Sequence, residues 1–149
     1  MAKIRGQIVV DTNVIVKLFF VEENSEQADR LLAGLDLKQI QFVVPSSLAL
    51  EFANVLWVKV RRGPTTRPEA ESILRRFVQL SGRIQIIDYA SVLSAIFAES
   101  IGLDHPAYDT AFTVLAERLK VPFITADRKL HNKLIADSRA SVLLRDVEI

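Results

Sequence analysis

Four carboxylates stand at positions where a purely structural role does not readily account for them. Asp11 ends a short apolar run in QIVVDTNVIV, and Asp127 follows another in FITADRKL. Glu51 lies among apolar residues in SSLALEFANVL, and Asp109 stands beside an apolar helical stripe. Two ionised carboxylates about 4 Å apart repel by about 4 kcal/mol at an effective dielectric constant near 20. If these side chains converge, only bound cations or protonation relieves that repulsion, and oxygen ligands favour Mg²⁺ or Mn²⁺.

Each carboxylate also has a structural interpretation, and the residues alone leave both open. Asp11 and Asp127 are good N-cap residues for a helix that follows a strand. Asp109 falls in the first turn of an expected helix, where an acid complements the helix dipole. Glu51 could form a salt bridge, although a charge on so apolar a helix is rarely buried unless it is paired or liganded.

The remaining chemistry of the chain is limited by its composition. The sequence contains no cysteine, which excludes disulfides, thiolate metal sites and cysteine nucleophiles and is compatible with the cytosol. The two histidines, His105 and His131, are isolated, and we interpret them as surface or capping residues rather than zinc ligands.

The elements that must position the acids alternate along the chain. Short apolar runs separated by helical periods predict a mostly parallel sheet with helices on both faces. The expected strands cover residues 7–10, 41–44, 84–87, 122–125 and 141–144. The expected helices are a short one from Val14, then 25–33, 46–60, 68–80, 90–101 and 106–120, and a short one after Asp127. Because the carboxyl ends of parallel strands share one edge, Asp11 and Asp127 meet if their strands are neighbours.

The helix expected over 106–120 carries an apolar stripe at helical spacing, which predicts packing on the sheet. Its members are Tyr108, Ala111, Phe112, Leu115, Ala116 and Leu119.

Length and hydropathy fit one domain over residues 1–149. A chain of 149 residues is long enough to bury a substantial core without disulfides or a structural metal. No apolar stretch approaches the roughly 20 residues of a membrane span, and the N-terminus lacks a secretory cleavage pattern. We therefore expect a cytoplasmic protein with no membrane partner.

Net charge is only +1, so any binding of nucleic acid must come from a local basic patch. Residues 59–76 carry six cationic residues against two glutamates, a local excess of four positive charges. The cationic residues are Lys59, Arg61, Arg62, Arg67, Arg75 and Arg76. Such a segment could follow a phosphate backbone. A solvated loop and helix end explain it equally well.

The segments VVDTNVIVKLF, LEFANVL and YDTAFTVLAERLKVPFITADRKL resemble, in order and spacing, the motifs of the PIN-domain nucleases. The compact length resembles the VapC-like toxins of bacterial and archaeal toxin-antitoxin pairs, and the likeness runs over nearly the whole chain. The resemblance places the family's acidic quartet on Asp11, Glu51, Asp109 and Asp127, with Thr12, Asn13 and Thr125 as supporting polar positions. Asp104, close to the quartet in sequence, is interpreted as a helix cap.

The resemblance implies a three-layer α/β/α fold whose parallel sheet of about five strands has the order 3-2-1-4-5. It implies a metal-dependent endoribonuclease that cleaves single-stranded RNA with a metal-activated water. The expected role is the toxin of a pair with a small antitoxin. Two alternatives stay open, namely a PIN nuclease in RNA processing without an antitoxin and a non-catalytic metal-binding interaction module.

A homodimer is also expected, partly from the family resemblance. The helix over 48–60 carries Phe52, Leu56, Trp57 and Val60, which is more apolar surface than one sheet face requires. The antitoxin could use the groove near Trp57.

Overall fold

A five-stranded parallel sheet organises the computed structural model, which describes residues 2–149. Its strand order is β4-β3-β2-β5-β6, and every neighbouring pair is parallel. The strands are β2 (Gly6–Val10), β3 (Ile40–Pro45), β4 (Gln85–Ile87), β5 (Phe123–Thr125) and β6 (Val142–Leu143). Numbered in chain order among themselves, these strands have the order 3-2-1-4-5, which confirms the prediction.

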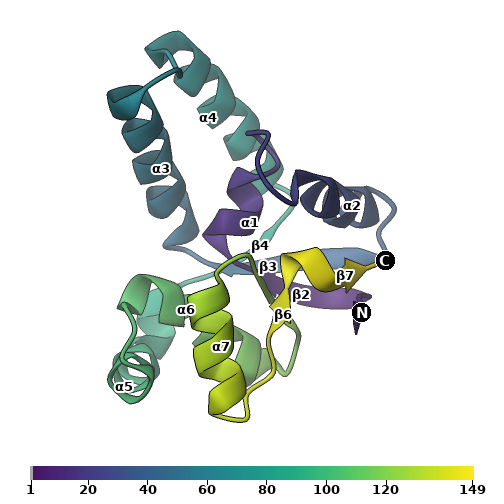
Figure 1. The fold of residues 1–149 in the computed structure, drawn as a ribbon, viewed down its shortest axis with the longest axis vertical. Coiled ribbons are helices and arrows are strands. Elements are labelled where there is room, and N and C mark those ends of the chain that lie inside the picture. Colours follow the sequence, from purple (N-terminus) through teal and green to yellow (C-terminus); the bar gives the residue numbers. More distant parts are fainter. Residues whose placement is uncertain (1) are drawn as a thin grey trace.

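Two further strands lie outside the main sheet and were not expected. β1 (Ala2–Lys3) pairs in parallel with β7 (Val147–Glu148), which brings the two ends of the chain side by side (Figure 1). Both strands have two residues, too short for a hydropathy pattern to indicate them.

Helices cover both faces of the sheet, as predicted. One layer contains α1 (Thr12–Val16), α2 (Ser25–Asp36), α3 (Leu48–Arg62) and α4 (Arg67–Ser81) (Figure 1). The opposite layer contains α5 (Leu93–Leu103), α6 (Ala107–Leu119) and α7 (Arg128–Ala136). Short 3₁₀ turns, η1 (Tyr89–Val92) and η2 (Leu144–Asp146), precede α5 and β7. Within residues 2–149, no helix combines the length and the apolar character that a membrane crossing requires.

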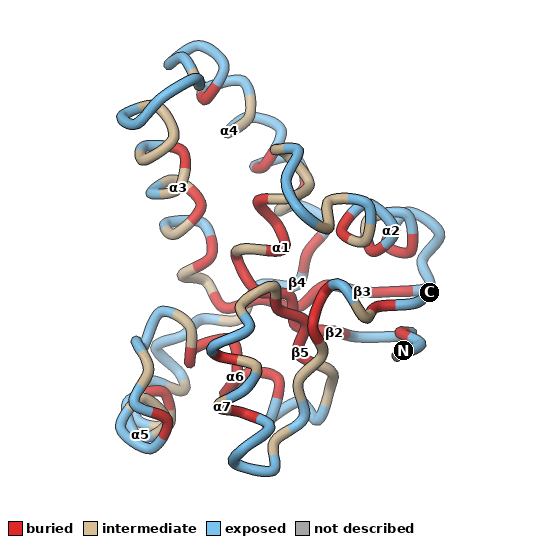
Figure 2. Tube along the Cα trace, viewed as in Figure 1, coloured by how far each residue is buried: buried red, intermediate tan, exposed pale blue. Residues whose placement is uncertain are grey.

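The core follows the central strands. Ile8, Val9 and Phe42 are fully buried because helices cover β2 and β3 on both faces, and the buried colour in Figure 2 is concentrated there. This double coverage explains why these strands read as continuous apolar runs rather than as alternating patterns.

Helix α6 packs on the sheet with only part of its expected stripe. Phe112 and Leu115 are buried, whereas Tyr108 is 70% exposed and Leu119 is 39% exposed, so the stripe was predicted too long at both ends. Both exposed residues lie in the terminal turns, beyond the reach of the sheet. The middle of α6 is instead buried on all sides, including Thr110 at 0%, because α5 packs against its outer surface.

The α3–α4 hairpin rises away from the sheet and is held at its base by three aromatic rings (Figure 1). Phe52 of α3 stacks on Phe77 of α4 at a centroid distance of 4.1 Å, and Phe19 meets both rings edge-on. Thr66 begins α4 with a capping box, accepting from the N–H of Glu69 while that side chain accepts from the N–H of Thr66.

The interpretation of α3 as surplus apolar surface is therefore wrong for two of its residues. Phe52 and Leu56 are buried within the chain by contacts that include α4. Val60 is partly buried, and only Trp57 of the four is exposed, at 54%. The homodimer stays a prediction without this support.

Candidate functional site

Asp11 joins strand β2 to helix α1 and is almost fully buried, with 2% of its surface exposed. It caps α1, since one carboxylate oxygen accepts from the N–H of Thr12 at 2.8 Å. The other oxygen accepts from the Thr125 hydroxyl at 2.8 Å and from the Asn13 amide at 3.2 Å. Capping therefore accounts for one oxygen, while side chains from α1 and β5 orient the other.

The supporting polar residues tie the start of α1 to the end of β5. Asn13 Oδ1 accepts from the N–H of Ala126 at 2.9 Å, and Thr125 Oγ1 accepts from the N–H of Asp127 at 3.0 Å. Thr12 differs, because its buried hydroxyl oxygen has no hydrogen-bond partner within the described residues. An orphaned hydroxyl beside carboxylates suits a site that receives a further polar group or an ion.

Asp127 follows β5 and caps α7 by accepting from the N–H of Leu130 at 3.1 Å. Since β2 and β5 pair directly, Asp11 and Asp127 lie at the same carboxyl edge of the sheet. The neighbouring-strand condition set by the sequence is therefore met.

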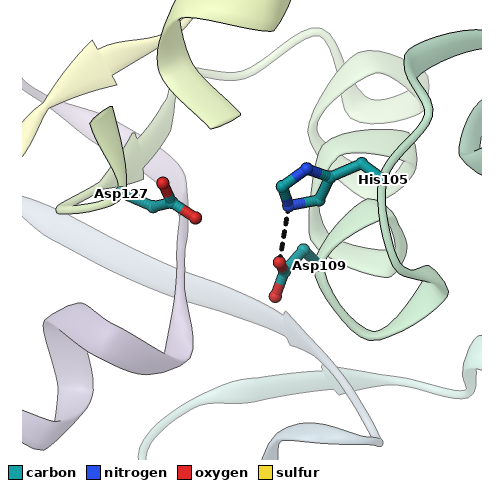
Figure 3. Close-up of side chains that lie close together, drawn as sticks. All are labelled: His105, Asp109 and Asp127. Atoms are coloured by element: carbon teal, nitrogen blue, oxygen red, sulfur yellow. Dashed lines mark hydrogen bonds and ion pairs between the residues drawn. The ribbon is translucent and has the colours of Figure 1, made fainter. Parts of the chain in front are cut away.

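Asp109 approaches Asp127 from the first turn of α6 (Figure 3). Its Oδ2 lies 2.7 Å from Nε2 of His105, whose side chain is only 6% exposed. The interpretation of His105 as an isolated surface or capping residue is therefore wrong. His105, Asp109 and Asp127 each offer a ligand atom, and these atoms lie within 4.8 Å of one another. His105 precedes α6, which begins at Ala107, and its spacing of four residues from Asp109 was the signal available in the sequence.

A lysine on α7 fixes the state of the His105 ring. Lys133 Nζ lies 3.3 Å from Nδ1 and also donates to the carbonyl of Asp104. An ammonium group only donates, so Nδ1 accepts and Nε2 carries the proton that is donated to Asp109. In this arrangement His105 orients the Asp109 carboxylate. Asp104 ends α5 in the left-handed conformation, as a C-cap, which agrees with its interpretation as a capping residue.

His131 lies apart from this cluster. Its Nδ1 is 2.9 Å from the Ser141 hydroxyl, a contact between α7 and the segment before β6. Among the described residues, the group of potential metal ligands does not include it.

Glu51 reaches the acids from α3 and is half-buried. Ser47 donates a long hydrogen bond of 3.4 Å to its Oε2, and no cation pairs with it within residues 2–149. The salt-bridge explanation for this acid is therefore not observed. Asp11, Glu51 and Asp109 together line an open cleft of about 450 Å³.

Burial and mutual repulsion raise the pKa of two of these acids. Burial, chiefly, and then the charges of Asp109 and Asp127 raise the pKa of Asp11 to about 7, against opposing hydrogen bonds from Thr125 and the Thr12 backbone. The pKa of Glu51 rises to about 8, first through burial and then through the charges of Asp11 and Asp109. The hydrogen bond from the Ser47 hydroxyl opposes this rise. Two carboxylates that resist ionisation at neutral pH form a site that a cation would stabilise.

The donor set fits a hard divalent cation. It consists of carboxylate oxygens from the β2–α1 junction, α3, α6 and the β5–α7 junction, with the orphaned Thr12 hydroxyl beside them. Oxygen-rich sites of this kind suit Mg²⁺ or Mn²⁺.

Only one cationic residue of the basic segment over residues 59–76 lies at the acidic cleft. Lys59 lines the acidic cleft, where it pairs with Glu22 at 3.0 Å and lies over the ring of Phe20. The other cationic residues lie on the α3–α4 hairpin and do not line the cleft. These residues are Arg61, Arg62, Arg67, Arg75 and Arg76. Their contact with RNA stays a prediction.

Comparison with known proteins agrees with this architecture. The model of the PIN domain family matches residues 8–134. Ribonuclease VapC3 of Pyrobaculum aerophilum is 34% identical over 131 residues, which cover 87% of this chain and 96% of that protein.

Solved structures share the fold at low sequence identity. The structure of PAE2754 from Pyrobaculum aerophilum superposes with a TM-score of 0.68 at 14% identity, covering 93% of this chain and 90% of that one. VapBC2 from Rickettsia felis was solved bound to a DNA fragment from its promoter. It superposes with a TM-score of 0.63 at 14% identity, covering 92% of this chain and 98% of that one. Family model, sequence relative and fold agree, and the chain belongs to the PIN-domain family, in its VapC branch.

Proposed function

We propose that the protein is a metal-dependent endoribonuclease that cleaves single-stranded RNA and serves as the toxin of a toxin-antitoxin pair. The observation that carries this proposal is the convergence of Asp11, Glu51, Asp109 and Asp127 at one edge of the sheet, beside an open cleft. The relative named Ribonuclease VapC3 supports the reaction class.

In this proposal the four carboxylates hold Mg²⁺ or Mn²⁺. The cation, when bound, supplies an activated water and neutralises charge on the attacked phosphate. Asp11 is held in one orientation by hydrogen bonds from Thr12, Thr125 and Asn13, which leave one lone pair of Oδ1 for a further ligand. In the layer of α5, α6 and α7, the hydrogen bond from His105 orients Asp109 in the same way.

The cleft shape favours an extended, flexible substrate. Asp11, Glu51 and Asp109 lie in an open groove whose wall continues along α3 through Val55 and Val58. A single strand can place one phosphodiester against the acids while its neighbours follow the groove, whereas a rigid duplex must be deformed to do so.

The proposed partner is a small antitoxin protein, supported by the likeness to VapBC2. Trp57 is exposed on α3, the helix from which Val58 and Lys59 line the acidic cleft. We expect Trp57→Ala to weaken complex formation with the antitoxin, measured by co-purification and calorimetry. Leu37→Ala, at an exposed apolar position after α2, is the matched control. Undiminished complex formation by the Trp57 variant would place the antitoxin elsewhere.

A homodimer in the cytoplasm completes the proposal. The exposed apolar side chains Leu93, Phe97 and Ile101 form one stripe on α5, and they offer surface for self-association that α3 does not. Light scattering at micromolar concentration tests this, and a monomer mass would refute it.

The decisive experiment is cleavage of a mixed-sequence single-stranded RNA with Mn²⁺ or Mg²⁺. We expect Asp109→Asn to lower the rate by about a hundredfold or more, because the isosteric change removes an anionic ligand. Asp29→Asn, at an exposed acid on α2, is the matched control and should cleave like the wild type. Near-normal cleavage by the Asp109 variant would assign that acid to the helix dipole, and cleavage in EDTA would refute the mechanism.

The two alternatives predict different results. A non-catalytic interaction module would bind Mn²⁺ without cleaving any RNA. A processing nuclease would cleave structured RNA in preference to an unstructured strand, and its expression alone would not arrest growth.

A further inference from the structure

A second hollow, of about 480 Å³, lies beside the acidic cleft and was not expected from the sequence. It is bounded by the β5–α7 junction, by the turn before α2 and by the segment after β6. Three exposed cationic side chains line it, namely Arg128, Lys129 and Arg145. Asp127 lines the same hollow, so a candidate metal ligand forms part of its wall.

The hollow and the acidic cleft are neighbours. Glu22 lines the cleft, and the next residue, Glu23, lines the hollow. Asp109 lines the cleft and Asp127 the hollow, yet their potential ligand atoms lie within 4.8 Å of each other. A phosphodiester seated at the acids of the cleft would therefore have the hollow on its Asp127 side.

The available positive charge is on the Asp127 side. In the cleft, Glu22 already pairs with Lys17 at 3.2 Å and with Lys59 at 3.0 Å. In the hollow, neither Arg128 nor Lys129 forms an ion pair within residues 2–149. Arg145 is only loosely paired, with its Nε 3.8 Å from Asp146.

We propose that this hollow binds phosphates of the RNA strand next to the cleaved bond, an inference that rests on the proposed function. Arginine forks match phosphate oxygens, and Lys129 adds a mobile point charge. The hydrophobic part of the lining is aliphatic, from Ala126, Leu143 and Leu144, without an aromatic ring for base stacking. Binding there follows the backbone and is tolerant of sequence, so discrimination between RNA sequences arises elsewhere.

The test compares two triple variants with the same loss of charge. The first is Arg128→Gln, Lys129→Gln and Arg145→Gln. The control changes three exposed cationic residues at the opposite edge of the sheet, where β2 begins and α6 ends: Arg5→Gln, Arg118→Gln and Lys120→Gln.

Binding is measured by fluorescence anisotropy with a labelled single-stranded RNA in EDTA, so that no cleavage intervenes. A plot of log affinity against log salt concentration has a negative slope, and for the first variant we expect this slope to become shallower by about two. Each cationic side chain removed should weaken binding about fivefold at 0.1 M salt. The control should bind within about twofold of the wild type, which is the scatter of such measurements. With Mg²⁺ present, KM should rise while kcat changes little.

The outcomes separate this inference from the proposed function. RNA binding that depends on the three cations without any cleavage refutes the nuclease proposal and supports the hollow as an RNA site. Cleavage by the wild type, with the first variant matching the control in slope and KM, overturns the hollow. A third outcome also overturns it. If the wild type binds a labelled acidic peptide and the first variant does not, while both bind RNA equally, the hollow serves a protein partner.

Discussion

The buried carboxylate of Asp11 makes the stability of the metal-free protein depend on pH in a way that one substitution should remove. Its ordinary pKa of 3.8 rises to about 7 in the folded chain, chiefly through burial. Between these values the folded state binds more protons than the unfolded state, so stability falls as pH rises from about 4 to about 7. Above that window the ionised carboxylate costs about 4 kcal/mol, taking about 1.4 kcal/mol per pKa unit.

Asp11→Asn removes this pH-dependent cost but weakens local hydrogen bonds. The Asn oxygen can still accept from the N–H of Thr12, which preserves the cap. The new NH₂ group faces the Asn13 amide and the Thr125 hydroxyl, both of which donated to the carboxylate, at a cost of about 1–2 kcal/mol. We expect equal stability near pH 5 and a variant more stable by about 2 kcal/mol near pH 8.5.

The assay is urea unfolding followed by far-UV circular dichroism in EDTA at both pH values. Asp29→Asn, which alters an exposed acid, should change stability by the same small amount at each pH. If Asp11→Asn destabilises the protein equally at both pH values, the carboxylate ionises normally in the fold and acts only as a helix cap. The reasoning about the acidic cluster would then be wrong.

Three further predictions follow from the contacts of the site and the core. Mn²⁺ affinity measured by calorimetry should rise from about pH 6 to about pH 8.5, because protons must leave Asp11 and Glu51, and a flat profile would remove both from the site. His105→Ala should lower kcat by about 10- to 100-fold through loss of its bond to Asp109, with partial rescue by His105→Gln; unchanged kcat would make that contact incidental. Phe77→Ala should lower the free energy of unfolding by about 3–5 kcal/mol in urea, because it leaves a cavity opposite its stacked partner, and a loss below 1 kcal/mol would count against the ring cluster.

The positions of the central strands could be predicted because both faces of the sheet are covered. Ile8, Val9 and Phe42 lie in runs that are apolar throughout, and only a doubly covered strand tolerates such a run. The order of the strands is a different matter. Each connecting helix determines beside which strand the next strand is placed, and the hydropathy pattern carries no information on this choice. The expected order came from the family resemblance.

The position of His105 shows what local patterns omit. Its ring contacts Lys133, which is 28 residues away and reaches it from α7. No spacing rule within one helix reports that contact. The basic hollow could not be predicted for the same reason, because its Arg128 and Arg145 come from separate segments of the chain.

The prediction that helix α3 carries surplus apolar surface was wrong for a related reason. An apolar helical face must be covered, but its pattern does not say whether its own chain or a second copy covers it. Phe52 is covered by Phe77, which follows 25 residues later in α4. A hairpin between two helices satisfies the same pattern as an interface between two chains.

The capping and ligand explanations of the acids are compatible, because a cap occupies only one lone pair of a carboxylate. Asp11 and Asp127 each use one oxygen for a backbone N–H at a helix start. The strands end at the sheet edge, and the following helices need caps there, so the fold itself demands polar residues at the place where ligands bind. Glu51 and Asp109 lie in the first turns of α3 and α6, where they complement the helix dipole, but within residues 2–149 neither accepts from a backbone N–H as a cap does. These two acids therefore distinguish a functional site from a set of helix caps, and we expect their substitution to lower activity without destabilising the fold.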